Sequence, residues 1–256
     1  LFSDIRGFTT LTEELGPHAT VSMLNEYFEL MVECIQQEGG MLDKFIGDAI
    51  MAAFGTPVRH DDDEDRAVRT AIAMLRSLAQ WNVKRAAEGK KPVNIGIGLN
   101  TDIVVAGEIG AVKRTNYTII GDGVNLAARL ESACKQYAAR ILISEFTYKK
   151  LRGTYRTREI DLVVVKGKTK PVAVYEVLDY HDETTFPNLQ DAVNQFKDGL
   201  AKYRAGKWEP AIAAFRKALR LNSKDKLAQI YIERCEKLKA EPPQGEWDGV
   251  WVMTDK

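Results

Sequence analysis

Two apolar runs, Met41–Ile46 and Ala49–Phe54, are joined by Gly47 and Asp48, and this joint constrains the fold more than any other part of the chain. Short apolar runs separated by Gly-Asp are typical of a β-hairpin, because both residues adopt the backbone angles of a tight turn. The hairpin nevertheless carries the charged side chains of Asp43, Lys44 and Asp48 within an otherwise apolar stretch. A turn alone explains Asp48 through its backbone preference, whereas a functional site would explain why charge is kept there.

The segments around this hairpin predict an α+β fold. The chain opens with a strand-like run, and apolar residues at helical spacing over 21–38 predict a helix that Gly39 and Gly40 end. A second helix should begin at the acidic residues 61–63, and alternation over 93–99 predicts a strand. The order strand, helix, hairpin, helix, strand is that of a ferredoxin-like β-α-β-β-α-β core. Additional elements should follow: strands over 103–106, 117–120, 140–143, 159–165 and 171–178, and helices over 124–137 and 144–151.

Composition narrows the class of protein. The 256 residues are 45% hydrophobic and carry no formal net charge, which predicts a globular core and no nucleic-acid partner. Three scattered cysteines without a CxxC motif predict neither a disulfide framework nor a structural zinc site, and favour a reducing, cytoplasmic location. No apolar run reaches the roughly 18–20 residues of a membrane span. The chain starts without methionine in a strand-like run, so we expect a further region to precede Leu1.

We predict two domains. Residues 1–179 form the main domain, 180–187 a linker, and 188–256 a small all-α C-terminal extension with an aromatic tail around Trp247 and Trp251. The extension resembles one tetratricopeptide unit plus a further helix, which is short of the three or so repeats that an independent solenoid needs. It should therefore pack against the main domain or a partner, with the tail folding back in preference to docking a partner peptide.

A second carboxylate should lie close to the hairpin turn. The segment Phe2–Phe8 places Asp4 at the end of an apolar strand, just before a glycine-containing loop. In a split β-α-β-β-α-β sheet the first strand lies beside the hairpin, so the strand end and the turn meet. The carboxylates of Asp4 and Asp48 would repel each other there unless a cation lay between them. Two oxygen ligands with room for phosphates describe a magnesium site.

Three separated motifs then point to a family. The segments FSDIRGFT (residues 2–9), KFIGD (residues 44–48) and YTIIGDGVNLAAR (residues 117–129) together resemble the catalytic domain of class III nucleotidyl cyclases. The resemblance spans roughly residues 1–178. It is greatest to soluble bacterial, including cyanobacterial, adenylyl cyclases with a C-terminal helical extension.

The resemblance implies roles for the residues at matching positions. Asp4 and Asp48 match two metal-binding aspartates and Ile5 adds its backbone carbonyl, so two Mg²⁺ ions are expected, with Mn²⁺ as the alternative. Lys44 and Thr118 match the pair that reads the purine. Adenylyl enzymes carry Lys with Asp or Thr at these positions, whereas guanylyl enzymes typically carry Glu and Cys. Without the resemblance, Lys44 reads as a solvated strand lysine and Thr118 as an ordinary strand residue.

Three further positions match residues that act on the sugar and the phosphates. Asn125 matches the residue that orients the ribose, Arg129 the residue that faces the reacting phosphate, and Lys166 the lysine that holds the terminal phosphates. Each also has a plain structural reading. Asn125 and Arg129 lie one helical turn apart and are equally consistent with a solvated helix surface. Lys166 is equally consistent with a charged turn.

The function implied is that of an adenylyl cyclase, which converts ATP to 3′,5′-cyclic AMP and pyrophosphate by two-metal catalysis at sites shared within a homodimer. Thr118 in place of Asp also resembles the subgroup that bicarbonate activates. One alternative is a guanylyl cyclase, against which Lys44 and Thr118 argue. Others are a degenerate cyclase domain with a regulatory or dimerisation role, and a protein whose function lies in its tetratricopeptide-like extension.

Overall fold

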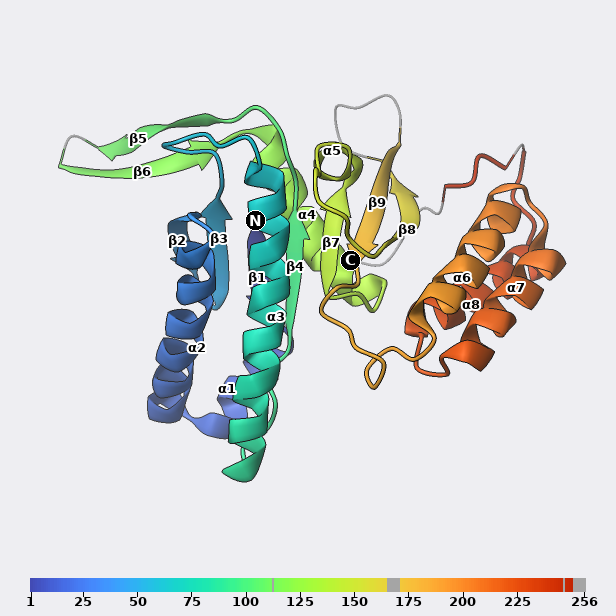
Figure 1. Ribbon diagram of the computed structural model, residues 1–256, viewed down its shortest axis with the longest axis horizontal. Helices are drawn as coiled ribbons and strands as arrows, with labels where there is room; N and C mark the ends of the chain where they lie inside the picture. Colours follow the sequence, from blue (N-terminus) through green and yellow to red (C-terminus); the bar gives the residue numbers. More distant parts are fainter. Residues whose placement is uncertain (112, 165–170, 246, 251–256) are drawn as a thin grey trace. The chain divides into compact units, whose positions relative to one another are not determined.

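The structure is a computed structural model that describes residues 1–111, 113–164, 171–245 and 247–250 (Figure 1). The chain forms two compact units. Unit 1 comprises Leu1–Lys135 and Arg140–Thr154, and unit 2 comprises Gln136–Ala139 and Tyr155–Lys256. No helix in the described part of the chain is both long and apolar enough to cross a membrane.

Unit 1 is built on a sheet with the strand order β2-β3-β1-β4-β7. β1 lies between β3 and β4 and is antiparallel to both, and β4 is parallel to β7. The order β4-β1-β3-β2 confirms the predicted ferredoxin-like core. The strands of this sheet are β1 (Phe2–Ile5), β2 (Met41–Ile46), β3 (Ala49–Ala53), β4 (Ile95–Leu99) and β7 (Ile141–Ser144).

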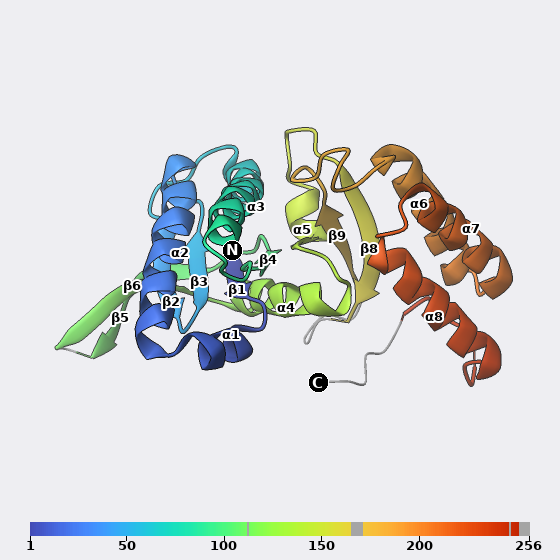
Figure 2. The ribbon, with the colours of Figure 1, turned by 90° about the horizontal axis from the view of Figure 1, so that it is seen from below.

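Helices cover both faces of these strands. Figure 2 shows α2 and α3 on one side of β1 to β4 and α4 on the other. α4 approaches β4 so closely that a Cβ atom at Gly98 would lie 2.2 Å from the Ala127 carbonyl oxygen, which explains the glycine. The helices of unit 1 are α1 (Phe8–Leu15), α2 (Pro17–Gln37), α3 (Asp63–Ala87), α4 (Asp122–Gln136) and α5 (Glu145–Tyr148).

Two details differ from the sequence prediction. α1 follows directly after Gly7, where a loop was expected, because glycine at φ 66° allows the chain to turn straight into a helix. The strand predicted over 103–106 instead runs as β5 over Val105–Ala111 and pairs with β6 (Arg114–Ile120) in a separate two-stranded sheet. Its residues lack the apolar alternation of a buried strand, since all but one are exposed.

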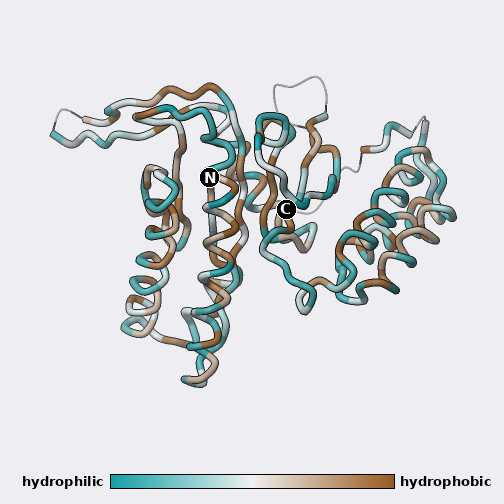
Figure 3. Tube along the Cα trace, in the orientation of Figure 1, coloured by the Kyte–Doolittle hydropathy of each residue, from teal (hydrophilic) through white to brown (hydrophobic). Residues whose placement is uncertain are grey.

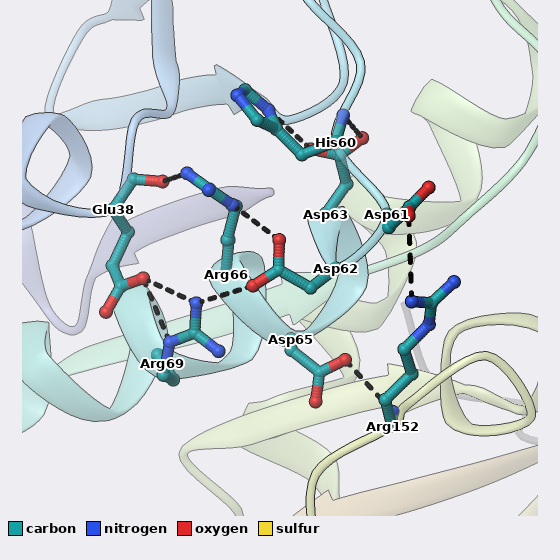
Figure 4. A network of polar contacts seen from close by, with 9 residues as sticks. All are labelled: Glu38, His60, Asp61, Asp62, Asp63, Asp65, Arg66, Arg69 and Arg152. Carbon is teal, nitrogen blue, oxygen red and sulfur yellow. Dashed lines mark hydrogen bonds and ion pairs between the residues drawn. The ribbon is translucent and has the colours of Figure 1, made fainter.

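The acidic residues at the start of α3 form ion pairs (Figure 4). Asp62 precedes the helix and makes no side-chain cap, but its carboxylate binds Arg66 at 2.8 Å and Arg69 at 3.1 Å. Hydrogen bonds from these two arginines lower the pKa of Asp62 to about 2. The buried Asp65 accepts hydrogen bonds from the backbone N–H groups of Arg152 and Gly153, which ties the segment after α5 to α3.

Unit 2 packs three helices with an antiparallel strand pair. The elements are β8 (Thr157–Val163), β9 (Val172–Val177), α6 (Leu189–Arg204), α7 (Trp208–Leu221) and α8 (Lys226–Ala240). Apolar residues recur along each helix (Figure 3) and form a core around Phe196, Phe215 and Tyr231. Gly199 lets α6 and α7 pack closely, because a Cβ atom there would lie 2.6 Å from the Phe215 ring.

The extension is joined to β8 and β9 by buried polar contacts. Arg158 of β8 binds both Glu176 of β9 and Asp225 at the start of α8, and the Tyr231 hydroxyl donates to a β8 carbonyl oxygen. Trp247 folds back, as predicted, and its indole N–H donates to the carbonyl oxygen of Tyr203 at 3.0 Å. Trp251 lies outside the described residues.

Candidate active site

Asp4 and Asp48 come together at one end of the sheet. β1 and β3 pair with Ser3 opposite Ile50, so Asp4 near the end of β1 lies beside the β2–β3 turn that carries Asp48. Burial and the neighbouring Asp4 carboxyl group raise the pKa of Asp48 to about 6. The Oδ2 atom of Asp48 is buried without a hydrogen-bond partner among the described residues. The two carboxylates that the sequence predicted to meet therefore do meet.

This arrangement fits a hard divalent cation. Burial is the largest cause of the raised pKa of Asp48, and the contribution from the neighbouring Asp4 carboxylate is the part that a cation would remove. An unpartnered buried carboxylate oxygen is a ready ligand, and Mg²⁺ binds through one or two carboxylates together with water and phosphate oxygens. No group of three or more His, Cys, Asp and Glu side chains in the described ranges could hold a metal. Further ligands would have to be a backbone carbonyl, such as that of Ile5, water or a substrate.

Arg6 fixes the position of the strand end that carries Asp4. Its guanidinium group donates to the backbone carbonyl of Glu131 on α4 at 2.7 Å and lies 2.8 Å from the Glu131 carboxylate. Gly96 on β4 makes room for this side chain, since a Cβ atom there would lie 1.7 Å from the guanidinium group. The acidic end of β1 is thus held against both β4 and α4.

Lys44 and Thr118 form a direct contact between β2 and β6. The Lys44 Nζ atom donates to the Thr118 Oγ1 atom at 2.9 Å. Thr118 is 6% exposed, whereas the side chain of Lys44 retains 43% exposure. The two residues predicted to read the purine, 74 positions apart in the chain, thus lie side by side.

Asp43 is a third residue of this cluster, and its charge was noted in the sequence but no role was predicted for it. The carboxylate of Asp43 accepts hydrogen bonds from the Thr118 hydroxyl at 2.7 and 2.9 Å and lies 3.1 Å from Lys44 Nζ. Its side chain is fully buried. The available signal was a second charged residue, next to Lys44, in a strand that is otherwise apolar.

A pocket of about 720 Å³ lies in front of this pair. Lys44, Thr118 and Asn125 all line it, together with apolar side chains that include Ile46, Met51 and Ile120. A cavity of this size with a few convergent polar groups is typical of a small-molecule site. The pocket thus unites three of the predicted site residues, one from each of β2, β6 and α4.

The remaining predicted residues lie elsewhere. Arg129 is exposed on α4 one turn after Asn125 and does not line the pocket. Asp4 and Asp48 do not line it either. Lys166 lies outside the described residues. Within the described part of one chain, the acidic pair and the purine-reading pair therefore do not share this pocket.

Comparison with known proteins agrees with these motifs. The family described as the adenylate and guanylate cyclase catalytic domain matches residues 1–179. The terminal-differentiation-specific adenylate cyclase of Dictyostelium discoideum is 37% identical over 238 residues, which are 91% of this chain and 11% of that protein. An adenylate cyclase of Anabaena cylindrica is 39% identical over 184 residues, which are 69% of this chain and 36% of that protein. The chain thus spans about a tenth to a third of the length of these relatives.

Solved structures of both nucleotide specificities share the fold. The crystal structure of the adenylyl cyclase CyaB from P. aeruginosa is 41% identical with a TM-score of 0.64, and covers 70% of this chain and 91% of its own. That of the guanylyl cyclase Cya2 is 38% identical with a TM-score of 0.63, and covers 69% and 88%. The fold alone therefore does not determine whether the substrate is ATP or GTP. Because the family match covers well over half of the residues, this chain belongs to the family of adenylate and guanylate cyclase catalytic domains, the class III cyclases, which generally use divalent metal ions.

Proposed function

We propose that this chain is the catalytic part of an adenylyl cyclase, which converts ATP to 3′,5′-cyclic AMP and pyrophosphate. The observation that carries the proposal is the contact between Lys44 and Thr118 at the edge of the 720 Å³ pocket. A lysine N–H can donate to a ring nitrogen of adenine, and a threonine hydroxyl can accept from the exocyclic amine. Adjacent protein atoms then bind both the ring nitrogen and the exocyclic amine of adenine.

The other residues act on the sugar and the phosphates. Asn125, at the same pocket, orients the ribose so that its 3′-oxygen faces the α-phosphorus. Arg129 neutralises the charge that grows on the phosphoryl oxygens in the transition state. Lys166 binds the terminal phosphates.

Asp4, Asp48 and the carbonyl group of Ile5 would hold two Mg²⁺ ions, with Mn²⁺ as the alternative. Ions bound there would make the ribose 3′-hydroxyl more acidic and would neutralise charge on the triphosphate. The chain's own contribution is to fix the two carboxylates against each other, through the β1–β3 pairing and the contacts of Arg6.

A head-to-tail homodimer completes each site, with the acidic pair from one copy and Lys44, Thr118, Asn125, Arg129 and Lys166 from the other. Apolar side chains next to the pocket are exposed in the single chain, and a second copy would cover them. These side chains belong to β2, β5 and β6 and include Phe45, Ile46, Ile109, Tyr117 and Ile120.

Three further properties belong to the proposal. The main domain ends at residue 179, and the tetratricopeptide-like extension of residues 188–256 stabilises its last two strands. The location is a reducing, cytoplasmic compartment, because the three cysteines are scattered along the chain without a CxxC motif. Bicarbonate is the candidate activator, on the ground of Thr118.

The test is nucleotide turnover by the purified chain with Mg²⁺ or Mn²⁺, with ATP and GTP compared in parallel and with bicarbonate added in a further series. We expect cyclic AMP from ATP and little cyclic GMP from GTP. A preference for GTP would establish the guanylyl alternative. Absence of turnover by a folded, dimeric chain with either metal would favour a degenerate regulatory domain.

A further inference from the structure

Asp43 is a fully buried carboxylate behind the purine-reading pair, and none of the roles above uses it. It accepts hydrogen bonds from the Thr118 hydroxyl, at 2.7 Å to Oδ2 and 2.9 Å to Oδ1, and from the backbone N–H group of Ile119 at 3.1 Å. Its Oδ1 atom lies 3.1 Å from Lys44 Nζ. Asp43 does not line the pocket, so it touches the pair without facing the ligand space.

An irregularity in β2 places Asp43 there. Successive side chains of a regular strand point to opposite faces, so Asp43 and Lys44 should diverge. In the β2–β3 ladder, however, Leu42 pairs with Ala52 and Lys44 with Met51, and the register shifts between them. An extra residue of this kind is a β-bulge, which re-aims side chains and is common beside active sites. Through the bulge, two consecutive side chains reach the same threonine hydroxyl.

The contacts determine which way the Thr118 hydroxyl points. A hydroxyl has one hydrogen to donate and two lone pairs to accept with, whereas an ionised carboxylate only accepts. The hydrogen of Thr118 is therefore directed at Asp43, and one lone pair takes the Lys44 N–H at 2.9 Å. The other lone pair remains for a ligand. Lys44 in turn uses one N–H on Thr118 and one on Asp43, which leaves its third as a donor.

We propose that Asp43 is a specificity-determining positioning residue: it holds Thr118 as a hydrogen-bond acceptor and thereby makes the pocket select adenine over guanine. The pair then presents one donor and one acceptor. Adenine offers the complementary groups, an acceptor at N1 and a donor amine at C6. Guanine offers the reverse, a donor at N1 and an acceptor oxygen at C6. This inference rests on the proposed function, because it assigns to Lys44 and Thr118 the reading of the purine.

The test is the ratio of kcat/KM for ATP to that for GTP, measured on the full chain and on Asp43→Asn. The amide of asparagine has nearly the same shape but carries an N–H₂ group, which can donate to the Thr118 hydroxyl and turn its hydrogen toward the ligand. We expect the ATP preference to fall about tenfold to a hundredfold, the size of a lost or mispaired polar contact in a buried site. Asp43→Ser, which is smaller and also removes the carboxylate, should lower the preference as well. It gives the second measurement if the asparagine variant does not fold.

Two controls separate selection from stability. Asp65→Asn removes another buried carboxylate, which binds the backbone N–H groups of Arg152 and Gly153 outside this pocket's lining. It should lower the melting temperature while leaving the ATP preference unchanged. In a Thr118→Val background there is no hydroxyl to orient. There, the further change Asp43→Asn should leave the preference as it is in Thr118→Val alone.

The outcomes distinguish this inference from the proposed function. If the unmodified chain prefers ATP and the Asp43 variants keep its preference within twofold, Asp43 is only structural and the inference is overturned. An equal shift in both Thr118 backgrounds also overturns it. If the unmodified chain prefers GTP or turns over neither nucleotide, the proposed function fails, whatever the Asp43 variants do.

Discussion

Arg158 on β8 donates a hydrogen bond to Asp225 at the start of α8, with the two side chains 2.8 Å apart and both almost completely buried. Glu176 on β9 binds the same guanidinium group at 2.7 Å. Burial alone would lower the pKa of Arg158, but the two carboxylates raise it instead. One arginine therefore links the last two strands of the catalytic domain to the helical extension.

The first prediction concerns this link. Arg158→Ala leaves Glu176 and Asp225 buried without their cation and should lower the free energy of unfolding by about 3–5 kcal/mol. Arg156→Ala is the matched control, because its partner Asp179 and its own side chain are partly exposed and its loss should cost less than about 1 kcal/mol. Urea denaturation measures both. If Arg158→Ala lowered the free energy of unfolding by as little as Arg156→Ala, the buried link would not stabilise unit 2.

The second prediction concerns removal of the extension. A chain that ends after residue 186 loses Asp225 and also Arg234, which lies 2.8 Å from the buried Asp161 of β8. We expect a lower melting temperature and increased proteolysis between residues 155 and 178, because buried charges lose their partners. Limited proteolysis with mass spectrometry locates the cleavage. A truncated chain as resistant as the full chain would contradict this role for the extension.

The third prediction is a pH dependence of the metal-free protein. The pKa of Asp48 is raised from 3.8 to about 6, so its contribution to stability is fully present below about pH 4 and is lost as the pH rises through 6. Asp48→Asn, which cannot ionise, should lose less stability over this window than the unmodified chain. It still loses some, because burial raises the pKa of Glu131 to about 7 and this carboxyl group titrates in the same range. Added Mg²⁺ at pH 7.5 should restore the unmodified chain and leave the variant unchanged. An equal Mg²⁺ effect on both would place the ion elsewhere.

The fourth prediction assigns Arg129 to the chemical step. Arg129→Ala should lower kcat by about 10²–10³-fold with a much smaller change in KM, since charge on the phosphoryl oxygens grows in the transition state. Arg140→Ala, which removes an arginine bound to Asn94 outside the pocket lining, is the control and should retain kcat. A rise in KM with unchanged kcat would instead make Arg129 a simple binding residue.

Much of this organisation was predictable because local sequence signals agree with the fold. The hairpin around Gly47 and Asp48 and the position of β1 beside it follow from turn chemistry and strand order, and they bring Asp4 to Asp48. Ser144 also caps α5, since its side chain accepts from the Thr147 N–H. The hairpin turn and this cap are determined by neighbouring residues alone.

The parts that were missed depend on tertiary contacts. No turn residue in the sequence indicates the bulge at Asp43. The carboxylate of Asp43 accepts hydrogen bonds from Thr118 and Ile119, which lie in a strand far along the chain. The strand β5 has mostly exposed residues, so its pairing with β6 leaves no apolar alternation to read. The junction between β8 and α8 likewise depends on charges distant in sequence, Arg158 and Asp225.

The most direct test of the account mixes two inactive chains, Asp48→Ala and Arg129→Ala. If each site takes its acidic pair from one copy and its arginine from the other, a mixed dimer holds one intact site. Random pairing then restores about a quarter of the unmodified cyclic AMP production, since half of the dimers are mixed and each has one good site of two. Production that stays at the level of the separate variants, with dimer exchange verified, would contradict sites shared between two copies.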